Sequence, residues 1–196
     1  MAYTTTAAVK AHLGITGTGQ DSVIDGLVAA AGRIIDNYTG SFFEAVTGDR
    51  TYDYQTDVTL WLDAPLHSLT TVTNGDGEAF ASGELRTMPL NGPPFVWLEV
   101  MGSSGTVFEP GDSGGQSAIT VTGTWGHLDA SGNTPTDITT AATMIAAWLY
   151  NRRQYHGVST FGTAETRVRF NEDNLPLEIR EILDGYRFPQ FRDFSG

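Results

Sequence analysis

The chain has 196 residues, 40% of them hydrophobic and 11% aromatic, so it can bury the core of one large domain or of a small core with an insertion. Its net charge of −12 argues against a protein that grips nucleic-acid phosphates, since that function needs clustered Lys and Arg. It has no cysteine, which excludes disulfides, cysteine zinc sites and thiol catalysis. Because we find neither a secretory signal nor an apolar run long enough to span a bilayer, we expect a chain made in the cytoplasm.

Two helices are predicted in the first 40 residues. Residues 4–13 place apolar side chains on one side, and a glycine-threonine loop follows. The next helix is expected from Asp21 or Ser22, either of which can cap it, to Tyr38, with Gly40 as the left-handed residue that ends it. Its apolar positions recur every 3.6 residues and comprise Val23, Ile24, Leu27, Val28, Ala31, Ile34, Ile35 and Tyr38.

Residues 41–128 change to alternating runs that are typical of strands, separated by Asn-Gly, Pro-Pro and Gly-Gly turns. This pattern predicts an antiparallel β region of about five or six strands. The strand-like runs are 58–62, 69–73, 95–100 and 118–125.

Helical patterning returns near Thr134, which can cap a helix whose first residue is Pro135 and whose end carries Arg152 and Arg153. After a loop over 156–174, a short last helix is expected at about 176–184, ending at Gly185. The predicted fold class is therefore α+β, a small bundle of about four helices with an inserted antiparallel β region. We expect a helical core of residues 1–45 plus 130–185, a β-rich insertion at 46–129 and a C-terminal tail at 186–196.

The segment Gly111-Asp-Ser-Gly-Gly115 matches the nucleophile segment of chymotrypsin-like serine proteases. That chemistry needs a histidine base that precedes the serine within a double barrel. His12 lies in the first helix, His67 is too close to Ser113 for the barrel, and the other histidines follow it. A glycine-rich hairpin loop is the favoured interpretation, and a serine hydrolase that uses Ser113 is kept as a remote alternative.

No metal or other cofactor is expected. The segment Asn74-Gly-Asp-Gly-Glu78 lacks the ligands of an EF-hand at both ends and is interpreted as a hairpin turn. The four histidines have no metal-ligand spacing. Trp61, Trp97 and Trp125 fall in apolar strand runs, which favours core or interface packing. If they were exposed, they would instead suit a carbohydrate- or receptor-binding β domain of a virion, which stays as an alternative function.

The C-terminal tail is not explained as core. It combines aromatic residues with arginine, the residue types that dominate protein–protein hot spots, and its phenylalanines recur every three residues. We therefore expect it to dock on a partner. The candidate partner-binding residues are Tyr186, Arg187, Phe188, Phe191, Arg192 and Phe194.

The ordered set of segments resembles the head-tail connector (head-completion adaptor) proteins of long-tailed bacteriophages. The resemblance lies in the Val9-Lys-x-x-Leu13 opening, the Ala30-Ala-x-x-Ile-Ile-x-x-Tyr-Thr-Gly40 helix end and the Arg152-Arg153 helix end. It continues in the middle with Leu62-Asp-Ala-Pro-Leu-His-Ser-Leu-Thr-Thr-Val72 and Ile119-Thr-Val-Thr-Gly-Thr-Trp-Gly126, and at the end with Ile182-Leu-Asp-Gly-Tyr-Arg187.

Such a resemblance implies a structural virion protein without an active site, located in the head-tail neck. Proteins of this family form a ring, commonly of twelve subunits, on the portal after DNA packaging. The ring extends the DNA channel and offers an attachment surface for the next neck or tail-completion protein. Packaged DNA is expected to pass through its lumen without specific binding, and no membrane is involved.

Overall fold

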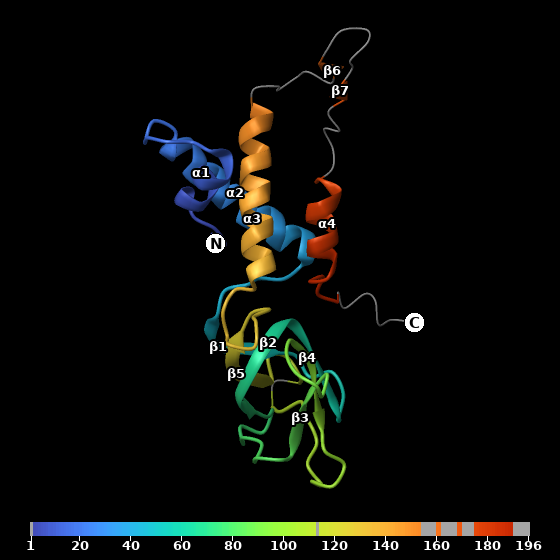
Figure 1. Cartoon of the computed structure of the whole chain (residues 1–196). Coiled ribbons are helices and arrows are strands. Elements are labelled where there is room, and N and C mark those ends of the chain that lie inside the picture. The colour runs from blue at the N-terminus through green and yellow to red at the C-terminus, as the bar shows by residue number, and fades with distance from the viewer. Residues whose placement is uncertain (1, 113, 154–159, 162–167, 170–174, 190–196) are drawn as a thin grey trace. The chain divides into compact units, whose positions relative to one another are not determined.

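The computed structural model describes residues 2–112, 114–153, 160–161, 168–169 and 175–189 (Figure 1). The chain divides into two compact units, one of Met1–Thr39 with Thr136–Tyr186 and the other of Gly40–Pro135 with Arg187–Gly196. In the described ranges, the first unit contains four helices and a pair of two-residue strands, and the second contains a five-stranded antiparallel sheet. This arrangement confirms the predicted α+β class.

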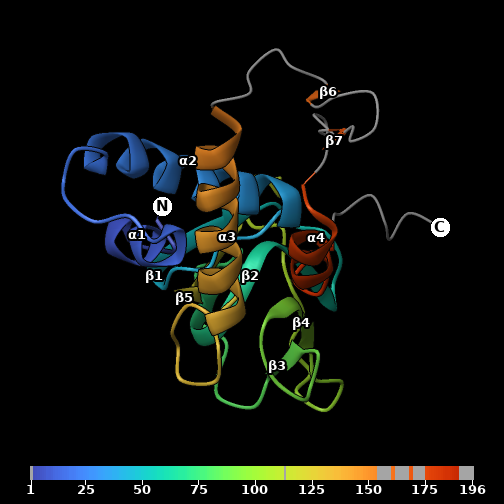
Figure 2. The same ribbon diagram turned by 45° about the horizontal axis from the view of Figure 1, so that its top comes forward.

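Four helices form the helical unit within the described ranges: α1 (Thr6–Leu13), α2 (Asp21–Thr39), α3 (Thr136–Arg152) and α4 (Leu177–Asp184). Helix α3 packs against each of the other three, and Figure 2 shows it between α1 and α4. The hydroxyl of Tyr38 on α2 also donates to Asp184 on α4 over 2.7 Å. The buried apolar side chains of this unit include Val9, Ile24, Val28, Ile35, Ile138, Ile145, Ile179 and Leu183.

Helix ends follow the sequence only in part. Gly40 has φ 64°, which confirms the expected left-handed end of α2. The expected caps are wrong. Asp21 is the first residue of α2 and its carboxylate lies 2.6 Å from Lys10 Nζ, while the Ile24 N–H donates to the Gln20 carbonyl. Helix α3 begins at Thr136, two residues after the expected cap Thr134, whose hydroxyl donates to the Phe43 carbonyl over 2.6 Å.

The β unit is built on β1 (Val46–Tyr52), β2 (Thr59–Thr73), β3 (Leu85–Met88), β4 (Phe95–Val100) and β5 (Ile119–Trp125), in the order β1-β5-β2-β4-β3. The runs 58–62 and 69–73, predicted as separate strands, belong to the single 15-residue strand β2. Its first part pairs with β4 and its second part with β5, with register shifts that mark bulges. Strands β1 and β3 were not predicted. Two short strands, β6 (Thr160–Phe161) and β7 (Val168–Arg169), pair within the segment expected as a loop.

The core of the β unit lies on one face of the sheet. Burial alternates along β5, because Ile119, Val121 and Trp125 point inward with Gly123 between them. Gly123 allows the bulged part of β2 to approach closely, since a Cβ at that position would lie 2.4 Å from the Ser68 carbonyl oxygen. The buried hydrophobic set also includes Tyr52, Leu60, Leu62, Leu66, Val72, Leu98, Val100 and Phe108.

Two loops of the β unit are joined by one buried side chain. Asn74, which begins the hairpin turn expected at 74–78, donates from Nδ2 to the Val107 carbonyl and accepts from the Glu109 N–H through Oδ1, both over 2.9 Å. The turn itself closes with a bond from the Gly77 N–H to the Asn74 carbonyl, and Gly77 has φ 85°. The glycine-aspartate segment is thus a structural turn, as expected.

Candidate assembly interface

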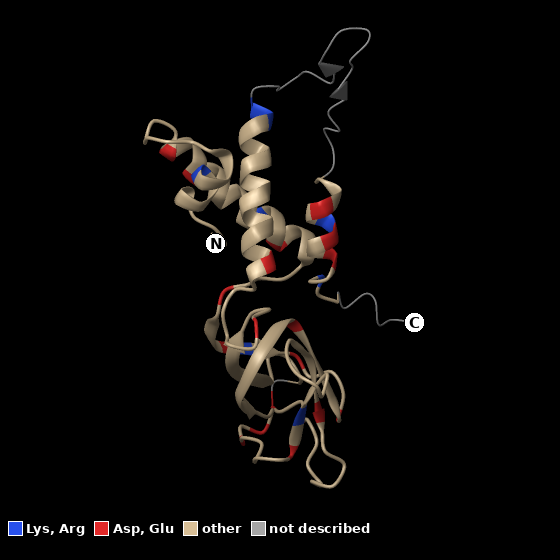
Figure 3. Cartoon of the chain, viewed as in Figure 1, with Lys and Arg blue, Asp and Glu red and all other residues tan. Residues whose placement is uncertain are grey.

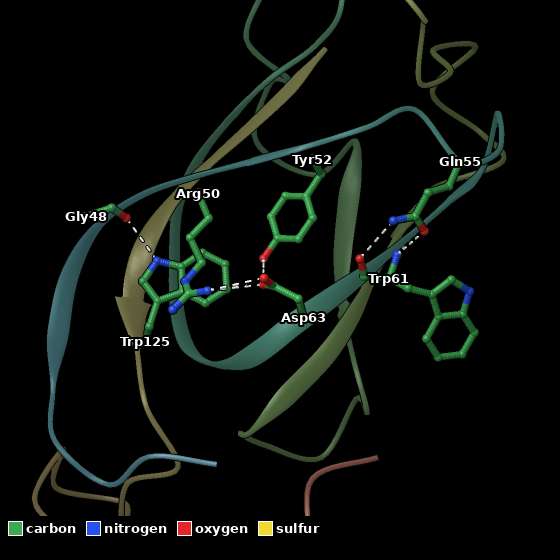
Figure 4. A network of polar contacts seen from close by, with 7 residues as sticks. All are labelled: Gly48, Arg50, Tyr52, Gln55, Trp61, Asp63 and Trp125. Atoms are coloured by element: carbon green, nitrogen blue, oxygen red, sulfur yellow. Dashed lines mark hydrogen bonds and ion pairs between the residues drawn. The ribbon is translucent and has the colours of Figure 1, made fainter. Parts of the chain in front are cut away.

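A polar network joins β1 to β2 (Figure 4). The Asp63 carboxylate accepts a hydrogen bond from the Tyr52 hydroxyl over 2.8 Å and lies 3.2 Å from the Arg50 guanidinium. Burial, and then the bond to Asp63, raise the pKa of Tyr52, so this phenol stays protonated. Arg50 also lies over the Trp125 ring, 5.0 Å from its centroid. These contacts hold the edge strand β1 against the rest of the β unit, so the role of the network is structural.

Trp125 is part of the core. Its side chain is 1% exposed, and its indole N–H donates to the Gly48 carbonyl over 2.9 Å. Of the three tryptophans proposed for a carbohydrate- or receptor-binding face, this one is therefore excluded. The interpretation of Trp125 as a packing residue is the one that the structure supports.

Trp61 and Trp97 lie side by side on neighbouring strands. They are register partners in the β2–β4 pair, with ring centroids 4.8 Å apart and planes tilted by 42°. Both are partly exposed, whereas Leu60, Leu62 and Leu98 beside them are buried, so the two rings point away from the core. Met88 of β3 is the register partner of Trp97 and is also partly exposed. We call Trp61, Trp97 and Met88 the tryptophan face.

The backbone below this face is held in place. The Gln55 side chain accepts from the Trp61 N–H over 2.9 Å and donates to the Trp61 carbonyl over 3.1 Å (Figure 4). The amide thus replaces a neighbouring strand on the edge of β2 that faces away from β4. A surface whose backbone is fixed in this way loses little conformational entropy when it binds a partner.

One ion pair borders the tryptophan face, two residues from Met88 on β3 and from Trp97 on β4. Arg86 Nη2 lies 2.9 Å from Glu99 Oε1, and the hydrogen bond to Glu99 raises the pKa of Arg86. Asp63, two residues after Trp61, is instead bound by Tyr52 and Arg50. Residues 40–135 contain twelve Asp or Glu and only two Arg, so most of the net charge of −12 lies in this segment, as Figure 3 shows for the described residues. Both arginines, Arg50 and Arg86, pair with acids.

The predicted partner-binding tail is described only at its start. The Tyr186 hydroxyl is 3.4 Å from Asp137 Oδ2, and burial, with this acid second, raises the pKa of Tyr186. Arg187 is exposed, whereas Phe188 is only 6% exposed and is therefore covered within its own chain. Phe191, Arg192 and Phe194 lie outside the described residues. Their docking role stays a prediction. Because Phe188 is buried, it is not available for docking on a partner.

The other candidate sites give no catalytic centre in the part of the chain that is described. Ser113 lies outside it, and His12 is exposed on α1 in the helical unit. His127 stacks on Phe43 with ring centroids 5.7 Å apart, and burial lowers its pKa. Across the described ranges, no group of three or more acidic or histidine side chains is placed to hold a metal ion, and no helix is long and apolar enough to cross a bilayer.

Sequence reasoning did not find the tryptophan face as a unit. It grouped Trp61 and Trp97 with the buried Trp125, favoured core or interface packing for all three and kept an exposed binding face as the alternative, and it did not single out Met88. The missing signal is the pairing register, which places residues that are 36 and nine positions apart on one face.

Comparisons with known proteins agree on the type of fold. A chain described as "Neck of empty GTA particle computed with C6 symmetry" has a TM-score of 0.58 and 18% identity, covering 97% of this chain and 91% of that one. A chain from "Neck of native GTA particle computed with C12 symmetry" has a TM-score of 0.57, 18% identity and coverage of 97% and 90%. A chain from "Virion of native gene transfer agent (GTA) particle" has a TM-score of 0.50, 20% identity and coverage of 97% and 91%.

No curated protein matches the sequence. The sequence profile of the family described as "Head completion protein" matches residues 2–188, which is nearly the whole chain. The fold, the order of the elements and this match lead to one conclusion: the chain belongs to the head completion protein family.

Proposed function

We propose that this protein is a structural component of the neck of a tailed-phage-like particle, where it forms a ring on the portal after DNA packaging. The observation that carries the proposal is the family match over residues 2–188. In this role the ring extends the DNA channel and provides the attachment surface for the next neck or tail-completion protein. The ring assembles in the host cytoplasm and remains in the virion.

The number of copies is proposed to be twelve. Two of the structurally similar chains come from necks computed with C6 and C12 symmetry, and the fold aligns with them over 97% of this chain. A closed ring requires a head-to-tail contact, in which one surface of a copy binds a different surface of its neighbour. Each copy must therefore present two complementary surfaces.

The negative net charge of the chain suits a channel through which DNA moves without being bound by the wall. A lumen wall that is poor in unpaired Lys and Arg releases few counterions on contact with DNA and therefore binds it weakly. In the β unit, both arginines lie within 3.2 Å of a carboxylate oxygen. DNA is thus proposed to pass without specific binding.

The role is assembly rather than catalysis, and it requires no cofactor. The remaining hydrolase alternative rests on Ser113, and it has a direct test. Incubation of the full chain with a fluorophosphonate probe should leave Ser113 unlabelled, and labelling that a Ser113→Ala variant abolishes would establish the alternative.

The experiment that tests the neck function uses the full chain and the purified portal of the same particle. Cosedimentation, followed by negative-stain imaging, should show rings of this protein on portal complexes. A chain that remains monomeric and never joins portal complexes at micromolar concentration would contradict the proposal.

A further inference from the structure

Two of the seven asparagines in the chain, Asn74 and Asn91, are followed by glycine. An asparagine in this context can lose its side-chain amide without an enzyme, because the backbone nitrogen of the next residue attacks the asparagine Cγ. A following glycine favours the attack, since it has no Cβ in the way and its backbone adopts the required geometry at little cost. The sequence thus gives both positions comparable intrinsic reactivity, and the fold determines which of them reacts.

The fold protects Asn74. This residue is buried, its Nδ2 donates to the Val107 carbonyl, and its Oδ1 accepts from the Glu109 N–H, both over 2.9 Å. The main chain of Gly75 is equally confined, because a Cβ at that position would overlap the Glu109 carbonyl oxygen. To bring its Cγ to the Gly75 nitrogen, Asn74 would have to break both side-chain hydrogen bonds inside this packed contact. The loss of these two bonds slows the reaction at Asn74.

Asn91 lies in the opposite environment. It is exposed in the loop that joins β3 to β4, and the two residues before it, Pro89 and Leu90, are exposed as well. Within the part of the chain that the structure describes, neither Asn91 nor Gly92 makes a hydrogen bond. A Cβ on Gly92 would meet no atom within 4 Å, so no packed segment confines this glycine on that side. The side chain can therefore reach the attacking nitrogen without breaking any bond to the rest of the β unit.

We propose that Asn91 is a site of spontaneous deamidation in the folded protein, whereas Asn74 keeps its amide. The Gly92 nitrogen forms a bond to Asn91 Cγ and gives up its proton, the bond from Cγ to Nδ2 breaks, and ammonia leaves. Water then adds to either carbonyl of the resulting succinimide ring and opens it to aspartate or isoaspartate. The net reaction consumes water and releases ammonia. It uses no oxidant and no catalytic side chain.

The modification changes the β3–β4 loop in two ways. Each event adds one negative charge to a chain whose net charge is already −12, so an aged sample should separate into charge variants on isoelectric focusing. Isoaspartate also routes the backbone through the former side chain of Asn91. Both changes occur at an exposed loop, so the core of the β unit stays intact.

The test follows both asparagines in one sample of the full chain. Trypsin places Asn74 in the peptide 51–86 and Asn91 in the peptide 87–152, and fragmentation in the mass spectrometer assigns the converted position. The native chain is incubated for several days at mildly alkaline pH, beside a fresh sample and a sample unfolded in guanidinium chloride. In the native chain, Asn91 should convert at least about tenfold faster than Asn74, because two hydrogen bonds must break first at Asn74. In the unfolded chain, the two rates should be similar.

The matched variant is Asn91→Gln, since glutamine must close a larger ring and reacts far more slowly. It should keep the peptide 87–152 unconverted at position 91 and remove the additional acidic band on focusing. An Asn91 that keeps its amide in the native chain, while the unfolded chain converts, would overturn the inference. Equal conversion of Asn74 and Asn91 in the native chain would overturn it as well.

Discussion

Gly123→Ala tests whether the close approach of β2 to β5 depends on the missing side chain. A Cβ at position 123 would lie 2.4 Å from the Ser68 carbonyl oxygen and 2.8 Å from Leu66 Cδ1, and the first of these is backbone that cannot rotate away. Overpacking of this kind destabilises a core by about 1–3 kcal/mol. For a unit of roughly 100 residues, each kcal/mol lowers the melting temperature by about 4–8 °C. We expect Gly123→Ala to lower the melting temperature of the β unit by at least about 4 °C.

The matched control is on the opposite strand. Gly48 is the register partner of Gly123, and a Cβ at Gly48 meets no atom within 4 Å. Gly48→Ala should leave the melting temperature unchanged or raise it, because alanine loses less conformational entropy than glycine on folding. The two proteins are compared by thermal unfolding followed through tryptophan fluorescence. Equal melting temperatures for the two variants would refute the argument that Gly123 is required by the β2 bulge.

Truncation after Pro189 should leave the melting temperature within about 2 °C of that of the full chain. Truncation after Gly185 should lower it further, because it removes the buried Phe188, and burying a phenylalanine contributes about 1.5–3 kcal/mol. Calorimetry of both truncated chains measures the difference. Binding to duplex DNA should be weaker than about 10 μM at physiological salt in an electrophoretic shift assay, and tighter binding would contradict the proposed lumen. Burial lowers the pKa of His127 below its ordinary value of 6.5, so the unfolded chain takes up the proton first as the pH falls. The melting temperature should therefore fall from pH 7 to pH 5, and it should fall less steeply in His127→Phe.

The helices could be predicted because their signal is local. The apolar spacing of α2 is visible along a single segment, and its expected end at Gly40 is confirmed. Helix starts were less predictable, because a polar side chain can cap a helix or bind elsewhere. Thr134 binds the Phe43 carbonyl, 91 residues away, and Asp21 pairs with Lys10.

The strands were harder to predict because their neighbours determine what their sequence must be. Strand β1 was missed because its inward side carries Gly48 and Arg50 as well as Tyr52, so apolar and polar residues do not alternate along it. In place of an apolar side chain, Arg50 lies over the Trp125 ring. The polar pair His67-Ser68 and Pro65 made β2 read as two strands, although bulges accommodate them within one. The tryptophan face depends on the same long-range register and therefore could not be deduced from spacing.

The bond between Thr134 and Phe43 joins the two ends of the segment that separates α2 from α3. All strands of the five-stranded sheet come from this one continuous segment, so it can form its pairings before the helices meet. Once its ends are joined, the loop that α2 and α3 must close shrinks from about 100 residues to fewer than about ten, which lowers the entropic penalty of closure by about 2 kcal/mol. Once its sheet has formed, the long segment between α2 and α3 therefore acts as a short connection between these helices. This favours a folding pathway in which the sheet forms before the helices meet.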